Sequence, residues 1–178
     1  MDTRKEKTHK KIKDTYLKLI KKKDPSHISA IELCEAAEIN RSTFYDHFGY
    51  MDGLVNEVIR DQVNIICNME GVEKVATSDE NGHIPRQVIE KIVNNYLNNE
   101  IIQIFLKSDR SNVYNQIIMD EQTKRTMVKL NCEFCYLRVY FMNVGLFMTL
   151  SKWLSSNKKM PIEKLIDIAY DYSIATYK

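Results

Sequence analysis

Residues 27–50 read HISAIELCEAAEINRSTFYDHFGY, and this stretch decides the fold of the N-terminal part of the chain. Ser29 and Glu32 have the spacing of a capping box, in which each side chain accepts a hydrogen bond from the other residue's backbone N–H. A helix is therefore predicted directly after Ser29. Asn40 favours a helix N-cap, which predicts a second helix from Arg41. Two short helices joined by a tight turn predict a helix-turn-helix.

The second of these helices has an apolar side and a polar side. Ile39, Phe44 and Phe48 lie on the side predicted to be buried, because they recur at helical spacing. In a helix-turn-helix the second helix enters the major groove of double-stranded DNA, so sequence-specific DNA binding is expected. The residues predicted to contact DNA are Ser29, Ala30, Asn40, Arg41, Ser42, Thr43, Tyr45, Asp46 and His47.

These residues are predicted to divide between bases and phosphates. Arg41, Ser42 and Asp46 are the candidates for base edges, since Arg suits guanine, a carboxylate can accept from cytosine, and Ser is permissive. Thr43 and Tyr45 are predicted to hydrogen-bond phosphates, together with Ser29 and the start of the helix that Ser29 caps.

The string Thr43-Phe44-Tyr45-Asp46-His47-Phe48 resembles the T-[LF]-Y-x-H-F signature of the TetR family of one-component regulators. The similarity extends over residues 4–65, and residues 140–154 are more weakly similar to the second-last helix of small members. The resemblance implies an all-α N-terminal domain that binds DNA and an all-α C-terminal domain that dimerises and usually holds a small effector. It also implies a role for the His47 imidazole at phosphate, and repression released by the effector.

Three features depart from the family pattern. Glu38 stands in the turn where the family usually has Gly, and Met51 stands where it usually has a phosphate-binding Lys. Residues 26–51 contain one cation and four acids. An activator or adaptor with weakened DNA contact, acting through a protein partner, is therefore an alternative. A small-ligand carrier or an enzyme that has borrowed the fold is a second one.

The charge needed to attract DNA is concentrated at the N-terminus. Residues 1–23 hold ten cations and three acids, a local charge of +7, while the rest of the chain carries −5 and the total is +2. A lysine-rich helix on its own is usually a solvated face. Beside a helix-turn-helix, it is predicted to bind phosphates, because release of their counterions drives non-specific affinity. Its apolar face is formed by Ile12, Tyr16, Leu19 and Ile20.

Composition predicts an all-α fold of about nine helices, since the 178 residues include only 5 Gly and 3 Pro and the apolar residues recur at helical spacing. Residues 1–50 are predicted to form the DNA-binding domain, 51–69 a linker helix, and 70–178 a C-terminal helical domain for dimerisation and effector binding. No apolar run is long enough for a membrane span, and a cytoplasmic protein is expected.

The C-terminal part contains many aromatic residues. Residues 132–155 are apolar around most of the predicted helix, which favours contact with a second copy of the chain. The predicted homodimer contacts are Gly145, Phe147, Trp153, Ile166 and Tyr172. The predicted effector-binding residues are Tyr96, Phe105, Tyr114, Tyr136 and Tyr140, for which ordinary core packing is the alternative.

No motif indicates catalysis, a metal or a cofactor. Cys132-x-x-Cys135 lacks a second ligand pair at metal-binding spacing and lies in an apolar helical pattern, so packing is expected. His9, His27 and His83 stand alone in the sequence and are predicted to be solvated. We expect a protein that is not an enzyme.

Overall fold

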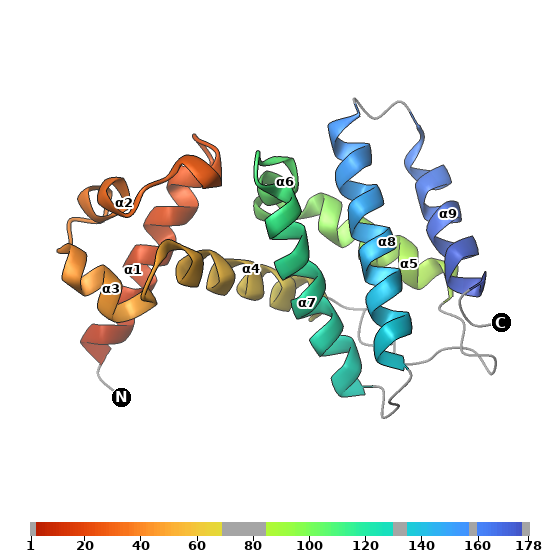
Figure 1. Cartoon of the computed structure of the whole chain (residues 1–178), viewed down its shortest axis with the longest axis horizontal. Helices are drawn as coiled ribbons and strands as arrows, with labels where there is room; N and C mark the ends of the chain where they lie inside the picture. The colour runs from red at the N-terminus through yellow and green to blue at the C-terminus, as the bar shows by residue number, and fades with distance from the viewer. Residues whose placement is uncertain (1–2, 69–84, 130–134, 157–159, 176–178) are drawn as a thin grey trace.

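The computed structural model describes residues 3–68, 85–129, 135–156 and 160–175. Within these ranges the chain forms nine α-helices and one short 3-10 turn, and no strand, so the all-α prediction is confirmed (Figure 1). The helices are α1 (Thr3–Ile20), α2 (Ala30–Ala36), α3 (Arg41–Phe48), α4 (Met51–Cys67), α5 (Arg86–Asn98), α6 (Glu100–Lys107), α7 (Ser111–Lys129), α8 (Cys135–Ser155) and α9 (Ile162–Ala175), and the turn η1 covers Pro25–His27.

Helices α1, α2 and α3 form the N-terminal part, on the left of Figure 1. Ile12 and Tyr16 of α1 and Phe44 of α3 are fully buried, and they meet Leu33 in one apolar core. Helix α3 begins at Arg41, as the sequence predicts. Local spacing of apolar residues therefore fixes which side of each short helix faces inward.

Helix α4 connects the N-terminal helices to the C-terminal ones. It leaves α3 and runs to α7, against which it packs (Figure 1). Leu54 and Val58 near its start and Val63 and Ile66 near its end are buried, so one apolar face of α4 serves the core along its whole length. Helix α4 therefore links the N-terminal and the C-terminal helices through one continuous element.

The C-terminal helices form a bundle in which α8 packs between α7 and α9, while α5 lies against α9 (Figure 1). Asn99 ends α5 and caps α6, because its side chain accepts a hydrogen bond from the Ile102 N–H at 3.0 Å. Pro85, which the sequence suggests as the first residue of this helix, is the N-cap of α5, so the helix begins one residue later, at Arg86. No helix in the described ranges has the length and apolarity that crossing a membrane requires.

Some boundaries lie outside the described residues. Residues 130–134 are not described, and they include Cys132, where the long apolar helix is expected to begin. His83 also lies outside the described residues.

Cys34 is buried in the core, as a small apolar residue would be. The 3-10 turn of residues 25–27 is not predicted from the sequence.

Glu38, in the turn between α2 and α3, has a positive φ of 51°, as expected from its place where the family has Gly. A left-handed conformation strains a side-chain-bearing residue by about 1–2 kcal/mol. The ion pair of Glu38 with Lys11 is long, 3.8 Å, and exposed, so it stabilises the fold little.

Replacing Glu38 by Gly is expected to raise the free energy of unfolding by about 0.5–1 kcal/mol, because the strain is relieved by more than the unfolded chain gains in entropy. Urea unfolding followed by circular dichroism measures the change. Glu35→Gly, inside α2, is the matched control and should destabilise by about 1 kcal/mol. A Glu38→Gly variant as unstable as this control would contradict the argument.

Candidate nucleic-acid interface

The N-terminus of α2 is built by the capping box that the sequence predicts. The Ser29 hydroxyl accepts a hydrogen bond from the Glu32 N–H at 3.2 Å. The pKa of Glu32 is lowered, chiefly by a hydrogen bond from Lys23, whose Nζ lies 2.8 Å from the carboxylate, and also by the Ser29 backbone N–H. Ser29 is exposed and Ala30 is half-buried, so the start of α2 is accessible to a phosphate.

Helix α3 presents most of its predicted DNA-contacting side chains to the outside. Arg41, Ser42 and Asp46 are exposed, as is Asn40, and Thr43 is half-buried. Asn40 occupies the N-cap position, but its side chain makes no capping hydrogen bond within the described residues, so the cap is weaker than expected. The face opposite Phe44 is therefore free to meet another molecule.

Two tyrosines stand next to each other at the end of this face. Tyr45 is 46% exposed and Tyr50 is 76% exposed, and their ring centroids are 6.4 Å apart. Tyr50 is not among the sequence-predicted contacts, the last of which is His47. An exposed aromatic residue directly after the second helix is the signal that could have identified it.

An open hollow of about 560 Å³ separates the N-terminal ends of α1 and α3. Its cationic and hydroxyl lining comes from Arg4 and Thr8 on α1 and from Arg41 and Thr43 on α3. The complete lining consists of Arg4, Thr8, Ile31, Cys34, Glu35, Glu38, Ile39, Asn40, Arg41 and Thr43. Helix α1 therefore contributes to the same surface as α3.

His47 is in contact with a histidine of α1. Its Nδ1 lies 3.3 Å from Nδ1 of His9, whose ring stacks on Phe48 and whose Nε2 lies 2.6 Å from the Glu57 carboxylate. The prediction that His9 is solvated is wrong, because the fold brings α1 against α3 and α4. The pKa of His47 is lowered, first by partial burial and then by the charges of His9 and Lys5.

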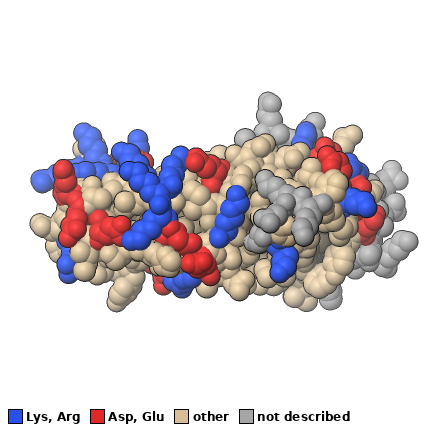
Figure 2. Space-filling model, turned by 90° about the horizontal axis from the view of Figure 1, so that it is seen from above, with Lys and Arg blue, Asp and Glu red and all other residues tan. Residues whose placement is uncertain are grey.

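Part of the positive charge of α1 is neutralised within the chain. Lys13 forms hydrogen bonds with Glu57 and Asp61, and Lys21 pairs with Glu100 at 2.6 Å. Figure 2 shows Lys and Arg side by side with Asp and Glu over the N-terminal helices. Among the lysines of residues 3–23, those that make no salt bridge within the described part of the chain are Lys5, Lys7, Lys10, Lys18 and Lys22.

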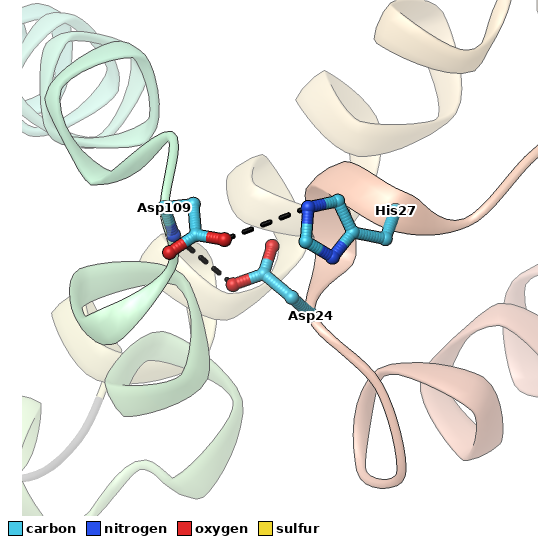
Figure 3. Close-up of side chains that lie close together, drawn as sticks. All are labelled: Asp24, His27 and Asp109. Carbon is cyan, nitrogen blue, oxygen red and sulfur yellow. Dashed lines mark hydrogen bonds and ion pairs between the residues drawn. The ribbon is translucent and has the colours of Figure 1, made fainter.

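Asp24 connects the N-terminal helices to the corner between α6 and α7. Its carboxylate accepts hydrogen bonds from the backbone N–H and hydroxyl of Ser26, from the Ser108 hydroxyl at 2.7 Å and from the Asp109 N–H at 3.0 Å. His27, predicted to be solvated, is exposed and lies 3.5 Å from the Asp109 carboxylate (Figure 3). The Asp-Pro-Ser sequence signals a cap, but not its partner across the fold.

These three side chains also have the proximity of metal ligands. One ligand atom from each of Asp24, His27 and Asp109 lies within 4.8 Å of the others. Both oxygens of Asp24 already accept hydrogen bonds from Ser26, Ser108 and the Asp109 N–H. These bonds, which outweigh the effect of burial, lower the pKa of Asp24 to about 2. The geometry is that of a structural link between two parts of the chain.

The predicted effector residues fall into separate contacts. Tyr96 is fully buried, packs edge-on against Phe147, and donates its hydroxyl to Gln122 at 2.9 Å. Phe105 and Tyr114 form another edge-on pair, 5.0 Å between centroids. The Tyr140 hydroxyl, nearer the surface, accepts a hydrogen bond from the Gln116 amide at 2.8 Å. The Tyr136 side chain is not among those that the structure describes. Effector binding by these residues stays a prediction.

The predicted dimer residues divide between core and surface. Phe147, Trp153 and Ile166 are buried by the chain's own helices, and the Trp153 indole donates to the Met160 carbonyl at 2.8 Å. Their side chains therefore offer little area to a partner. Tyr172 is exposed, and Gly145 lies beside it. A Cβ atom added at Gly145 would lie 4.0 Å from the Tyr172 ring.

Comparison with protein-family models and with curated proteins finds no match. Solved structures do match over nearly the whole chain. A TetR-family transcriptional regulator from Mesorhizobium loti aligns with 98% of this chain and 97% of its own, with a TM-score of 0.57 and 15% identity. Thermus thermophilus FadR, a TetR-family transcriptional repressor in complex with lauroyl-CoA, aligns over 93% of both chains, with a TM-score of 0.59 and 14% identity.

A third similar structure is Pseudomonas aeruginosa NalD, the secondary repressor of the MexAB-OprM multidrug efflux pump. It aligns with 96% of this chain and 95% of its own, with a TM-score of 0.51 and 16% identity. The chain therefore has the fold of TetR-family regulators, as the string at residues 43–48 predicts.

Proposed function

We propose that the chain is a transcriptional regulator of the TetR type, which binds double-stranded DNA as a homodimer and acts as a repressor released by a small effector. The observation that carries this proposal is the accessible outer face of α3, where Arg41, Ser42 and Asp46 are exposed beside Tyr45. A braced helix with such side chains has the form of a major-groove reader. The predicted cytoplasmic location belongs to this proposal, since the protein must reach the chromosome.

The proposed contacts follow the two kinds of surface. Arg41 and Asp46 meet base edges together with Ser42, while Thr43, Tyr45, His47 and the capped end of α2 at Ser29 meet phosphates. Arg4 lines the hollow that also includes Thr43, so the N-terminal end of α1 adds to the phosphate contacts.

The homodimer proposal is supported by apolar side chains that remain exposed on α8 and α9. Phe141 and Tyr172 stack across the two helices, with their centroids 5.6 Å apart, next to Gly145. The exposed large apolar residues of these helices are Leu137, Phe141, Met148, Ile168 and Tyr172. Such a group is typical of a surface that another protein covers, and a symmetric dimer uses the same surface twice.

The effector proposal and the repressor proposal are supported by two proteins of the same fold. FadR is seen in complex with lauroyl-CoA, and NalD is a repressor. In this chain an effector bound among the C-terminal helices would act on the DNA-binding part through α4, which packs on α7. Effector and DNA would then oppose each other with a coupling free energy of about 1–3 kcal/mol.

The alternative is an adaptor that has weakened its DNA contact and works through a partner protein. The salt bridges that tie Lys13 to Glu57 and Asp61 favour it, because these charges are used within the chain. Met51, which cannot neutralise a phosphate, favours it too. A DNA reader that makes about four to six ionic phosphate contacts should lose affinity with salt at a log-log slope of about −4 to −5, whereas an adaptor should show a flat dependence.

Selection of bound duplexes from a random library tests the proposed function, with the chain's own upstream region as a second probe. A dimer of symmetric readers is expected to select an inverted repeat. Failure to enrich any sequence over several rounds, with a folded protein, would contradict sequence-specific binding.

Arg41→Ala is expected to weaken binding to the selected duplex by about 1–3 kcal/mol and to relax the preference at one base position, because Arg41 is exposed at the first residue of α3. Fluorescence anisotropy on a panel of single-base variants measures both effects. Lys91→Ala, which removes one exposed cation on α5, is the matched control and should leave the preference unchanged. Equal weakening on every duplex would assign Arg41 to a phosphate.

A further inference from the structure

A chain of polar contacts runs from α4 through α1 to the DNA-facing helix α3. The Glu57 carboxylate lies 2.6 Å from His9 Nε2, and His9 Nδ1 lies 3.3 Å from His47 Nδ1. Lys13 also binds Glu57, at 2.9 Å between Nζ and Oε1. Three side chains separated by as many as 48 residues in sequence are thus aligned behind the predicted phosphate contact.

The contacts fix where the protons of the two imidazoles are. Burial raises the pKa of Glu57, but hydrogen bonds from His9 and Lys13 outweigh it, so the net pKa is lowered and the carboxylate stays ionised. An ionised carboxylate only accepts hydrogen bonds, so His9 Nε2 carries a proton. Between the two Nδ1 atoms one nitrogen must donate and the other accept, so this contact holds a single proton.

The neutral pair therefore holds two ring protons, one on His9 Nε2 and one between the two Nδ1 atoms. A third proton can go only to His47 Nε2, the one ring nitrogen that makes neither contact. In the neutral pair Nε2 of His47 has a lone pair and repels a phosphate oxygen. Once protonated, it is a charged donor, and the hydrogen bond it makes to a phosphate is among the strong ones. A fourth proton would set N–H against N–H at 3.3 Å, so the pair takes up one proton as a unit.

We propose that Glu57 and His9 are positioning residues that hold His47 ready to take up a proton when the chain binds the DNA backbone, so that DNA binding tightens as the pH falls. This inference rests on the proposed function, which supplies the phosphate. His47 makes the contact, and the other two act through it.

The charges around His47 set the direction of the effect. On α1, Lys5 and His9 disfavour its protonation, and Lys13 lies on the Glu57 side. On α3, Asp46 favours protonation, and α4 supplies Glu57 and Asp61, both of which are held by Lys13. Partial burial is the largest cause and lowers the pKa of His47, so the free protein disfavours a proton on His47 Nε2. A phosphate placed at Nε2 reverses this balance.

The first test measures duplex affinity from pH 5.5 to 8 at constant ionic strength, on the duplex selected as described above. Uptake of one proton per protomer is expected to tighten binding by up to about tenfold per pH unit per His47 as the pH falls through the titration range. His47→Gln should remove this pH dependence. Glu57→Gln should move its midpoint to lower pH, because the charge that favours an imidazolium is lost, and a merely structural residue would not move the midpoint.

His27→Gln is the matched control, since this histidine pairs with Asp109 at the other end of the N-terminal part, and the wild-type pH profile should remain. A wild-type affinity that is flat with pH, or a profile that survives in His47→Gln, would overturn the inference while DNA binding stands.

The second test needs no DNA. Nitrogen-15 correlation spectra of the histidine side chains in the free protein should show His9 protonated at Nε2 and His47 protonated at Nδ1 at pH 8, with one shared titration step below. Separate, independent titration steps for His9 and His47 would overturn the inference. If the spectra agree with the expected tautomers but no variant binds any duplex at any pH, the proposed function fails and the proton arrangement remains.

Discussion

Replacing Gly53 by Ala is expected to destabilise the chain by about 3 kcal/mol and to abolish binding to the selected duplex. A Cβ at this position would lie 2.1 Å from the carbonyl oxygen of Phe48, the last residue of α3. The obstacle is backbone, which cannot rotate away as a flexible side chain can. Accommodating the methyl group requires α3 to shift relative to α4, and this shift would displace the residues proposed to read DNA.

Urea unfolding and duplex binding measure the two effects of Gly53→Ala separately. Gly145→Ala is the matched control for stability, because among the described residues the added methyl group meets only the Tyr172 ring at 4.0 Å, an ordinary contact. Its effect on stability should be small or favourable, since Ala is about 1 kcal/mol better than Gly inside a helix. A Gly53→Ala chain with unchanged stability and unchanged affinity would mean that α3 is not held against α4 as described.

Gly53 illustrates a signal that was present in the sequence. A glycine inside a helical pattern is unfavourable, so a close backbone approach is a common reason for it. The start of α3 at Arg41 and the cap at Ser29 were predictable for a similar reason. Each depends on residues within four positions, where side-chain and backbone chemistry alone decide the conformation.

Contacts between distant segments could not be predicted in this way. His9 and His47 are 38 residues apart, and Asp24 and Ser108 are 84 apart. Nothing in the local pattern around either histidine distinguishes a solvated ring from a paired one. Tertiary packing of α1 decides it.

The apolar helix α8 also shows a limit of prediction from sequence. Its sequence is apolar around most of the circumference, so periodicity could not tell which residues meet the chain's own core. Phe147 and Trp153 turn inward, whereas Phe141 and Leu137 are exposed. Contact of α8 with a second copy of the chain therefore stays a prediction, and Phe141 and Leu137 are among the exposed residues of α8 that could make it.

Asp24→Ala is expected to destabilise the chain by about 3 kcal/mol, because the carboxylate is the common acceptor for Ser26, the Ser108 hydroxyl and the Asp109 N–H. A hydrogen bond to a charged group contributes about 1.5–3 kcal/mol, and part of this is regained from water where the site is open. The loss also frees the end of α1 from the corner between α6 and α7. In the proposed regulator, effector binding should then change DNA affinity less in this variant than in the wild type.

The pH dependence of unfolding distinguishes the Asp24 carboxylate from the loss of packing. The pKa of Asp24 is about 2 in the folded chain against an ordinary 3.8, so its contribution is complete above about pH 4 and is lost as the pH falls toward 2. The stability difference between wild type and Asp24→Ala should shrink over this range. Asp109→Ala removes an exposed carboxylate from the same corner and should change stability by less than about 0.5 kcal/mol, since it leaves the backbone N–H that Asp24 binds. If both variants were equally destabilised, with the same pH dependence, the link would depend on the fold of the corner, and Asp24 would not be its centre.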